Sequence, residues 1–269
     1  MVTLANRTES VVIDIGGMPV LLRTTERAFA ELLEERYSGF VNPFASPTFD
    51  IEVTLVPSGV FAGEEDVKVR QRSGCWSLER GDFRAEWDPA SRQGSVRQSA
   101  NPYAIDSVLR ILHTLLLASE GGFLVHAASA VRSGRALLFA GRSGAGKTTL
   151  ARLAPPEVTL LSDEISYVRR LDEGYQAFGT PFSGELARLA ENLSAPLAAL
   201  YVLEKGPGIK IEPLAEADAV NALLQNILFF AEDAQLVERV FASACEFIRR
   251  VPAYRLTFAP SSRVWEALG

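Results

Sequence analysis

The residues whose types and spacing most clearly suggest chemistry lie in the segment Gly-Arg-Ser-Gly-Ala-Gly-Lys-Thr-Thr, residues 141–149. A glycine, four residues, a second glycine, a lysine and a hydroxyl residue form the phosphate-binding P-loop (Walker A) pattern. The glycines allow the backbone N–H groups to turn toward an anion, Lys147 can reach the β- and γ-phosphates, and the Thr148 hydroxyl can bind Mg²⁺. The residues expected to bind ATP are Gly141, Ser143, Gly144, Ala145, Gly146, Lys147, Thr148 and Thr149.

The local context supports this interpretation over that of a glycine-rich turn without a ligand. The apolar run 136–140 predicts a buried strand, and residues 149–154 predict a helix that ends before Pro155 and Pro156. The positive N-terminal end of such a helix adds to the attraction for phosphate. Lysine is also scarce in this chain, so a lysine would rarely occupy the motif position by chance. The lysines are Lys68, Lys147, Lys205 and Lys210.

A second candidate lies at residues 159–164, where a short apolar strand ends in Asp163 and Glu164, as a Walker B segment does. Phosphoryl transfer needs a carboxylate that holds Mg²⁺ or accepts the proton of the nucleophile. Asp163 follows Lys147 by 16 residues, enough for a crossover helix and a return strand. We therefore expect Asp163 beside the loop in a parallel sheet, with Thr148, Asp163 and Glu164 as metal ligands. The alternative is that Asp163 caps a turn and Glu164 is solvated.

Two further segments contain polar residues of a kind found in active sites. His126 lies in the apolar strand-like run 123–129, 15 residues before Gly141. A histidine in such a run is more commonly a satisfied core residue. Residues 179–185 form a Gly- and Pro-containing loop that ends in Glu185, for which a plain turn is the alternative.

The order of these segments resembles the catalytic domain of the bacterial HPr kinase/phosphorylase family. The shared features are a histidine-bearing strand, then the P-loop, then paired acids and a later Gly-containing loop with an acid, over about residues 122–186. The resemblance implies a nucleotide-binding fold shared with ATP-dependent phosphoenolpyruvate carboxykinase. It also implies Mg²⁺- and ATP-dependent phosphorylation of a serine on a small protein or peptide.

The resemblance implies a role for each acidic residue as well. Asp163 would be the base toward the serine, Glu164 and Glu185 would be metal-linked acids, and His126 would contact phosphate or substrate. The chain departs from the family pattern in two places. The family's second acid is usually Asp, where this chain has Glu164, and residues 180–185 do not match the family's substrate-loop signature.

These departures leave two alternatives to a serine kinase. One is a nucleotide-binding regulatory module that transfers no phosphoryl group. The other is a small-molecule kinase or a carboxykinase-like enzyme, which needs further cations for an acidic substrate. Lys205, Lys210 and Arg255 are available for that purpose, although solvated surface charge is their simpler interpretation.

Composition excludes several other classes of protein. The net charge is −6 and the pI is about 5.2, which argue against a nucleic-acid partner and an anionic membrane surface. No apolar stretch reaches transmembrane length, and the first residues lack a signal-peptide pattern. Cys75 and Cys245 are isolated and are expected to be reduced thiols in a cytoplasmic protein.

The remaining elements predict an α/β protein in two parts. Residues 1–100 are expected to form a smaller, mostly-β part, with strands at 11–15, 19–22 and 49–56, a helix at 26–37 and an antiparallel meander to residue 98. Residues 101–269 are expected to form a carboxykinase-like P-loop domain with a mixed sheet. Its first helix, at 103–119, is nearly apolar all round and therefore buried in the core or in a homo-oligomer interface. Further helices are predicted at 218–230 and 233–250.

Overall fold

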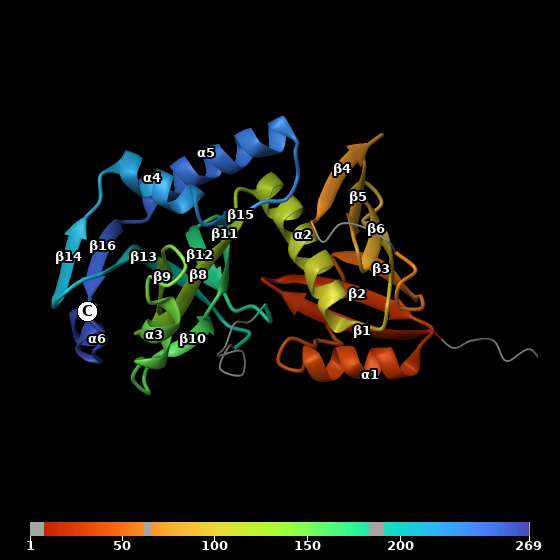
Figure 1. The fold of residues 1–269 in the computed structure, drawn as a ribbon, viewed down its shortest axis with the longest axis horizontal. Helices are drawn as coiled ribbons and strands as arrows, with labels where there is room; N and C mark the ends of the chain where they lie inside the picture. The colour runs from red at the N-terminus through yellow and green to blue at the C-terminus, as the bar shows by residue number, and fades with distance from the viewer. Residues whose placement is uncertain (1–7, 62–65, 183–190, 269) are drawn as a thin grey trace, which may run out of the picture. The chain divides into compact units, whose positions relative to one another are not determined.

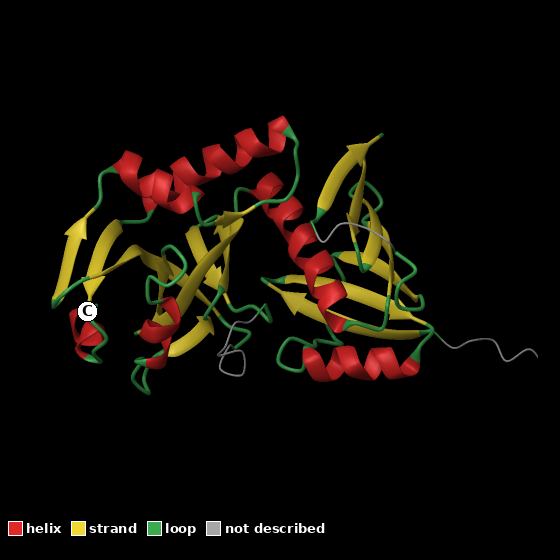
Figure 2. Ribbon diagram, in the orientation of Figure 1, coloured by secondary structure: helices red, strands yellow, loops and turns green. Residues whose placement is uncertain are grey.

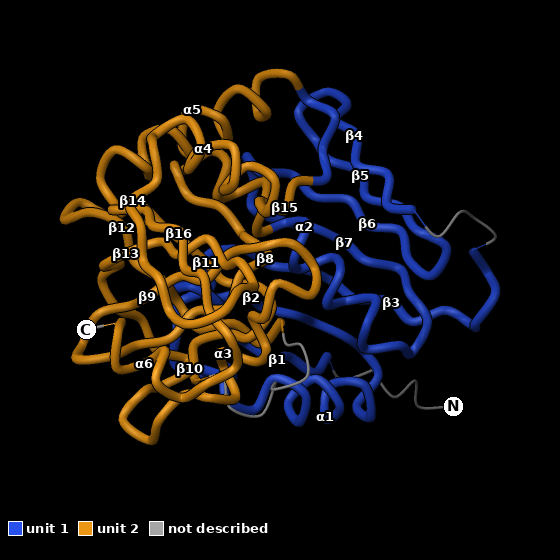
Figure 3. The backbone as a smooth tube through the Cα atoms, turned by 60° about the vertical axis from the view of Figure 1, so that its left-hand side comes forward, with its two compact units in different colours: residues 1–112, 230–233 blue, residues 113–229, 234–269 orange. Residues whose placement is uncertain are grey.

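The computed structural model describes residues 8–61, 66–182 and 191–268 and has a mixed α/β fold (Figures 1 and 2). The chain forms two compact units, one of residues 1–112 with 230–233 and the other of residues 113–229 with 234–269 (Figure 3). Among the described residues, no helix is long and apolar enough to cross a membrane. Cys75 and Cys245 are free cysteines, as predicted.

The described residues of the first unit are built on a seven-stranded sheet with the order β1-β2-β3-β7-β6-β5-β4. Its elements are β1 (Glu9–Ile15), β2 (Met18–Thr24), α1 (Arg27–Arg36), β3 (Phe49–Leu55), β4 (Lys68–Arg72), β5 (Cys75–Arg80), β6 (Phe83–Asp88) and β7 (Gln93–Gln98). Alternate residues of the strands are buried, as in Phe83, Ala85 and Trp87 of β6, so one face of the sheet carries the core.

The predicted antiparallel meander is correct only for β4 to β7. The pairs β2–β3 and β3–β7 are parallel. Helix α1 lies between β2 and β3 in the chain and contacts β1 and β2, so it provides the crossover that a parallel pair requires.

Helix α2 (Pro102–Glu120) runs through the division between the two units, so the domain limit predicted at residue 101 stays a prediction. Asn101 Oδ1 accepts the N–H of Tyr103 at 2.9 Å, which caps the helix start. At the other end, the Gly122 N–H donates to Leu117 O at 3.0 Å after Gly121 has taken a φ of +81°. In its first half, the buried Asp106 accepts hydrogen bonds from Arg36 and Tyr37.

The described part of the second unit contains nine strands and the remaining helices. Its elements are β8 (Phe123–Arg132), β9 (Arg135–Ala140), α3 (Lys147–Arg152), β10 (Thr159–Ser162), β11 (Ile165–Leu171), β12 (Gly174–Phe178), β13 (Ser194–Lys205), β14 (Ile209–Pro213), α4 (Glu216–Leu224), β15 (Ile227–Leu228), α5 (Ala234–Arg250), β16 (Ala253–Phe258) and α6 (Arg263–Ala267). The sheet is mixed, as predicted, because β13 is parallel to β9 and β16 while the other pairs are antiparallel.

The two longest strands close five of these strands into a ring. The first half of β8 pairs with β11 and its second half with β9, while β13 pairs first with β12 and then with β9. The path β8-β11-β12-β13-β9 therefore returns to β8. Successive residues of these strands face two apolar clusters, so that Leu138 lies in one and Phe139 in the other. Helices α4 and α5 contribute to the first cluster, and α3 and α6 to the second. Burial on both faces explains the unbroken apolar run of β9.

Candidate functional site

The phosphate-binding pattern forms a turn between the end of β9 at Ala140 and the start of α3 at Lys147, in the predicted strand–loop–helix setting. Two glycines of the turn have left-handed backbones, Gly144 with a φ of +76° and Gly146 with a φ of +112°. A Cβ atom at Gly146 would lie 2.9 Å from Phe258 Cζ. Glycine is therefore required at residue 146 for two reasons, its backbone conformation and the approach of the Phe258 ring.

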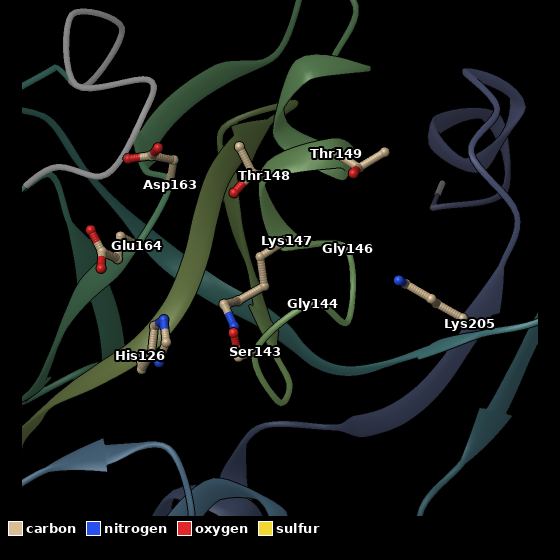
Figure 4. Close-up of a pocket in the computed structure, with 10 residues that line it drawn as sticks. All are labelled: His126, Ser143, Gly144, Gly146, Lys147, Thr148, Thr149, Asp163, Glu164 and Lys205. Carbon is tan, nitrogen blue, oxygen red and sulfur yellow. The ribbon is translucent and has the colours of Figure 1, made fainter.

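Lys147 is buried, and its ammonium group donates a hydrogen bond to Gly141 O at 2.7 Å. Burial lowers the pKa of Lys147 because it disfavours the charged form, and the Glu164 carboxylate partly opposes that shift. The ammonium group thus contacts the start of the loop, near Ser143, and interacts electrostatically with Glu164 (Figure 4).

Helix α3 has only six residues, fewer than two full turns. A helix of this length has a small macrodipole, so attraction for an anion rests mainly on the loop N–H groups and on Lys147. The Trp265 indole N–H of α6 donates to Leu150 O at 3.0 Å and pairs one of the last carbonyls of α3.

Asp163 and Glu164 are presented by a turn that follows β10. The buried Ser162 Oγ accepts the backbone N–H groups of Glu164 at 3.3 Å and of Ile165 at 3.0 Å. Ser162 therefore organises this turn, which is the capping role considered for Asp163. Asp163 is itself 4% exposed, and Glu164 is half-buried rather than solvated.

The expectation that Asp163 adjoins the loop in a parallel sheet was wrong in one respect. Strand β8 lies between β9 and β10 and is antiparallel to both, with Ala127 opposite Ala140 and Ser129 opposite Ser162. Because β9 and β10 share one antiparallel neighbour, they run in the same direction and their carboxyl ends meet at one edge. The loop and the acids are thus brought together across an intervening strand.

His126 lies on that intervening strand, at the same edge, opposite Ile165 in the register of β11. Its side chain lines the same cavity as the loop, so it is not a core histidine (Figure 4). Burial lowers the pKa of His126 below its usual 6.5, the Lys147 charge lowers it further, and Glu164 opposes both effects. The imidazole is therefore neutral at pH 7.

These side chains share a cavity of about 460 Å³ (Figure 4). Its lining residues are His126, Ser143, Gly144, Gly146, Lys147, Thr148, Thr149, Asp163, Glu164 and Lys205. Two residues predicted to bind ATP, Gly141 and Ala145, line a neighbouring cavity of about 710 Å³ instead.

Lys205, which the sequence offered only as a possible contact for an acidic substrate or as solvated surface charge, lines the same cavity as the loop. It ends β13, which is parallel to β9 and places Val202 opposite Ala140, so Lys205 emerges at the same edge as the loop. It lines both cavities. The scarcity of lysine was a usable signal, because Lys147 and Lys205 both lie here, whereas Lys210 is exposed and pairs with Glu212 at 2.8 Å.

Glu185 lies outside the described residues. The described residues at the beginning of its loop have structural roles: Thr180 Oγ1 donates to Ile165 O at 2.7 Å, and Phe182 is fully buried against the His113 ring.

Arg255, the other cation that the sequence offered, pairs with Glu204 at 3.1 Å and lines the larger cavity.

The donor atoms near the loop suit a hard cation. A hydroxyl and two carboxylates, from Thr148, Asp163 and Glu164, line the smaller cavity, and Mg²⁺ prefers such oxygen ligands. Within the described ranges, no group of three or more His, Cys, Asp or Glu residues is placed to hold a metal ion.

Comparison with known proteins places the second unit in a family. No curated protein matches the chain significantly. Residues 99–269, more than half of the chain, match a family described as SynChlorMet cassette protein ScmC. The match includes the loop, the paired acids, His126 and Lys205. The chain therefore belongs to the SynChlorMet cassette protein ScmC family.

Proposed function

We propose that this protein is a Mg²⁺- and ATP-dependent kinase of the HPr kinase type that transfers the γ-phosphoryl group to a serine of a small protein or peptide. The observation that carries the proposal is the shared cavity of Lys147, Thr148, Asp163 and Glu164, which come from separate segments of the chain. The order of these segments also supports a carboxykinase-like fold for the second unit.

Phosphate binding is assigned to the loop and two lysines. The N–H groups of the loop and the Lys147 ammonium group form an electropositive cradle, and Lys205 adds a second cation at its rim. On binding, the phosphate oxygens take the place of Gly141 O as acceptors for Lys147, which also favours the protonated form of that lysine.

The Thr148 hydroxyl, Asp163 and Glu164 would hold Mg²⁺. Such an ion would supply positive charge to offset the negative charge that develops on the phosphate oxygens.

Asp163 is assigned the role of general base. It accepts the proton of the serine hydroxyl while the hydroxyl oxygen forms a bond to the γ-phosphorus. The bond between the γ-phosphorus and the bridging oxygen breaks, and ADP leaves with its electron pair. The neutral imidazole of His126 contacts the transferred phosphoryl group or the acceptor as a hydrogen-bonding group.

Calorimetric titration with ATP, with and without Mg²⁺, tests the first half of the proposal. The wild-type protein should bind ATP in a metal-dependent manner, and Lys147→Ala should lose that binding. Lys210→Ala is the matched control, because Lys210 is 65% exposed in its pair with Glu212 and lines neither cavity. Unchanged affinity in Lys147→Ala would exclude the loop as the phosphate site.

Transfer is tested separately, by following the γ-phosphoryl group into small serine-containing proteins encoded beside this one. Phosphoserine formation that requires Mg²⁺ supports the kinase. Tight ATP binding without transfer to any hydroxyl acceptor would favour a regulatory nucleotide-binding module instead.

A further inference from the structure

The larger cavity, of about 710 Å³, has no role in the phosphate chemistry described above. It is lined by the first half of the loop, residues 141–145, and by the end of β13, Arg255 of β16 and helix α4 with the residues around it. Its volume lies within the range of small-molecule sites. Ser143, Gly144 and Lys205 line both cavities, so a ligand anchored on the loop can extend from one into the other.

One face of α4 and its C-terminal end supplies polar groups to this cavity. Asp218, Asn221, Ala222 and Gln225 are spaced at three- and four-residue intervals, which places them on the same side of the helix. The small Ala222 leaves room between a carboxylate and two carboxamides. The next residue, Asn226, also lines the cavity, and its Nδ2 donates to Ala222 O at 2.8 Å, leaving its Oδ1 as an acceptor.

Charged groups line the cavity on both sides, and Glu204 at the end of β13 pairs with Arg255 of β16 at 3.1 Å. The cations Arg142 and Lys205 belong to the loop and to the end of β13, whereas α4 contributes a carboxylate and carboxamides. Carboxylates commonly bind ribose hydroxyls, and carboxamides can pair with the hydrogen-bonding edge of a purine. The two cations near the loop and the neutral or acidic acceptors of α4 match a molecule with phosphates at one end and a nucleoside at the other.

We propose that this cavity binds the ribose and purine base of a nucleoside triphosphate whose phosphates lie on the loop. The inference rests on the proposed function, and it adds α4 as the element that recognises the nucleoside. It also assigns the acceptor to the smaller cavity, beside Asp163.

The test compares a ligand that has a nucleoside with one that has none. MgATP and magnesium tripolyphosphate are titrated calorimetrically into the wild type, Ala222→Leu and Ala217→Leu. Ala217→Leu is the matched control, since it makes the same substitution on the same helix at an exposed residue that does not line the cavity. We expect Ala222→Leu to weaken MgATP binding at least tenfold while tripolyphosphate affinity stays within twofold, and Ala217→Leu to change neither.

The outcomes separate this inference from the proposed function. If tripolyphosphate and ATP bind the wild type, but Ala222→Leu leaves ATP affinity unchanged, the nucleoside lies elsewhere and the loop assignment stands. Weakened phosphorylation of the acceptor with unchanged ATP affinity would make the cavity an acceptor site, and the inference would be wrong. If the wild type binds neither ligand, both proposals fail.

Tripolyphosphate binding also reports whether Ala222→Leu is folded. Should that variant lose both ligands, Asn221→Ala replaces it. This variant removes a carboxamide without adding volume, and the same selective loss of ATP affinity is expected.

Discussion

At the level of single residues, the site combines two bases, Lys147 and His126, with an acid, Glu164, whose charge influences both. Burial lowers the pKa of both Lys147 and His126, and Glu164 opposes the shift in each case. Glu164 is thus electrostatically coupled to both bases, while Ser162 holds the turn that carries Glu164 and Asp163. Burial, aided by the Lys147 charge, lowers the pKa of His126 and so strengthens the preference of its imidazole for the neutral form at pH 7.

Asp163→Asn tests the assignment of the base. The amide keeps the size of the carboxylate but cannot accept the hydroxyl proton, so the first-order transfer rate should fall by about 10²- to 10⁴-fold. The measurement is single-turnover transfer from ATP to the acceptor at saturating Mg²⁺. Asp172→Asn, at an exposed turn, is the control and should transfer at the wild-type rate. Wild-type transfer by Asp163→Asn would assign the base to another group.

At the level of elements, the shape of the loop depends on contacts made by strands far away in the sequence. Phe258 of β16 approaches Gly146 at the start of α3, and Trp265 of α6 binds the other end of that helix. Nothing lies within 4 Å of a Cβ atom built on Gly144, although its φ is also positive. A substitution at Gly144 therefore introduces backbone strain alone, whereas one at Gly146 introduces backbone strain and a close contact with Phe258.

Gly144→Ala and Gly146→Ala should differ in stability for this reason. Gly144→Ala carries only the strain of a left-handed backbone, about 1 kcal/mol. Gly146→Ala adds a clash with the Phe258 ring and should lower the free energy of unfolding by a further 1–3 kcal/mol or so. Urea denaturation of both variants measures the difference. Equal losses would show that the Phe258 ring moves aside without cost.

Helix α2 carries a histidine that the fold keeps neutral. His113 is fully buried, with Nδ1 at 2.9 Å from the Tyr167 hydroxyl. Burial, aided by the charge of Arg169, lowers the pKa of His113 to about 3. An unfolded chain takes up that proton near pH 6.5, so it binds more protons than the folded protein between about pH 6.5 and pH 3.

The free energy of unfolding should therefore fall as the pH is lowered from 6.5 toward 3, with the full contribution of His113 present above pH 6.5. Its contribution to the slope is at most about 1.4 kcal/mol per pH unit. His113→Gln removes the titrating group, so its slope between pH 6 and pH 4 should be shallower than that of the wild type. Urea denaturation at several pH values measures both slopes. Identical slopes would mean that His113 titrates normally.

At the level of the whole molecule, the proposed binding site belongs to one of the two units. Every residue that lines either cavity lies in the second unit, and the family match begins at residue 99, so most of the first unit lies outside it. Each unit contains its own tryptophan residues, so each can be followed separately by fluorescence. Trp76 and Trp87 belong to the first unit, and Trp265 packs near α3 in the second.

This division predicts a local effect of the ligand on stability. MgATP at 100 times its dissociation constant should raise the free energy of unfolding of the second unit by about 2.7 kcal/mol. A variant with Trp76→Phe and Trp87→Phe reports that unit through Trp265, and Trp265→Phe reports the first unit. MgATP should raise the free energy of unfolding of the first unit by less than that of the second. Equal shifts would show that both units unfold as one cooperative body.

The local sequence predicts the structure of the loop well, but it predicts poorly the segments whose structure depends on pairing with distant parts of the chain. The glycines, Lys147 and Thr148 are contiguous, and their flanking strand and helix have local patterns, so this part was predictable. The apolar residues 227–230 were assigned to a helix, yet α4 ends at Leu224 and Ile227–Leu228 form β15. A short apolar run suits either structure, and pairing with β8 decided between them. Strand β12 and helix α6 were missed.

Which residues make up the site could be learned only from the tertiary structure. The position of β8 between β9 and β10, the arrival of Lys205 from β13 and the polar face of α4 all depend on the strand order and the ring closure of the second unit. Spacing along the chain predicts which residues are local neighbours, because the geometry of a turn or a helix is local. Which strand ends share an edge depends on the burial of two apolar clusters drawn from most of the second unit, and only the folded chain shows that arrangement.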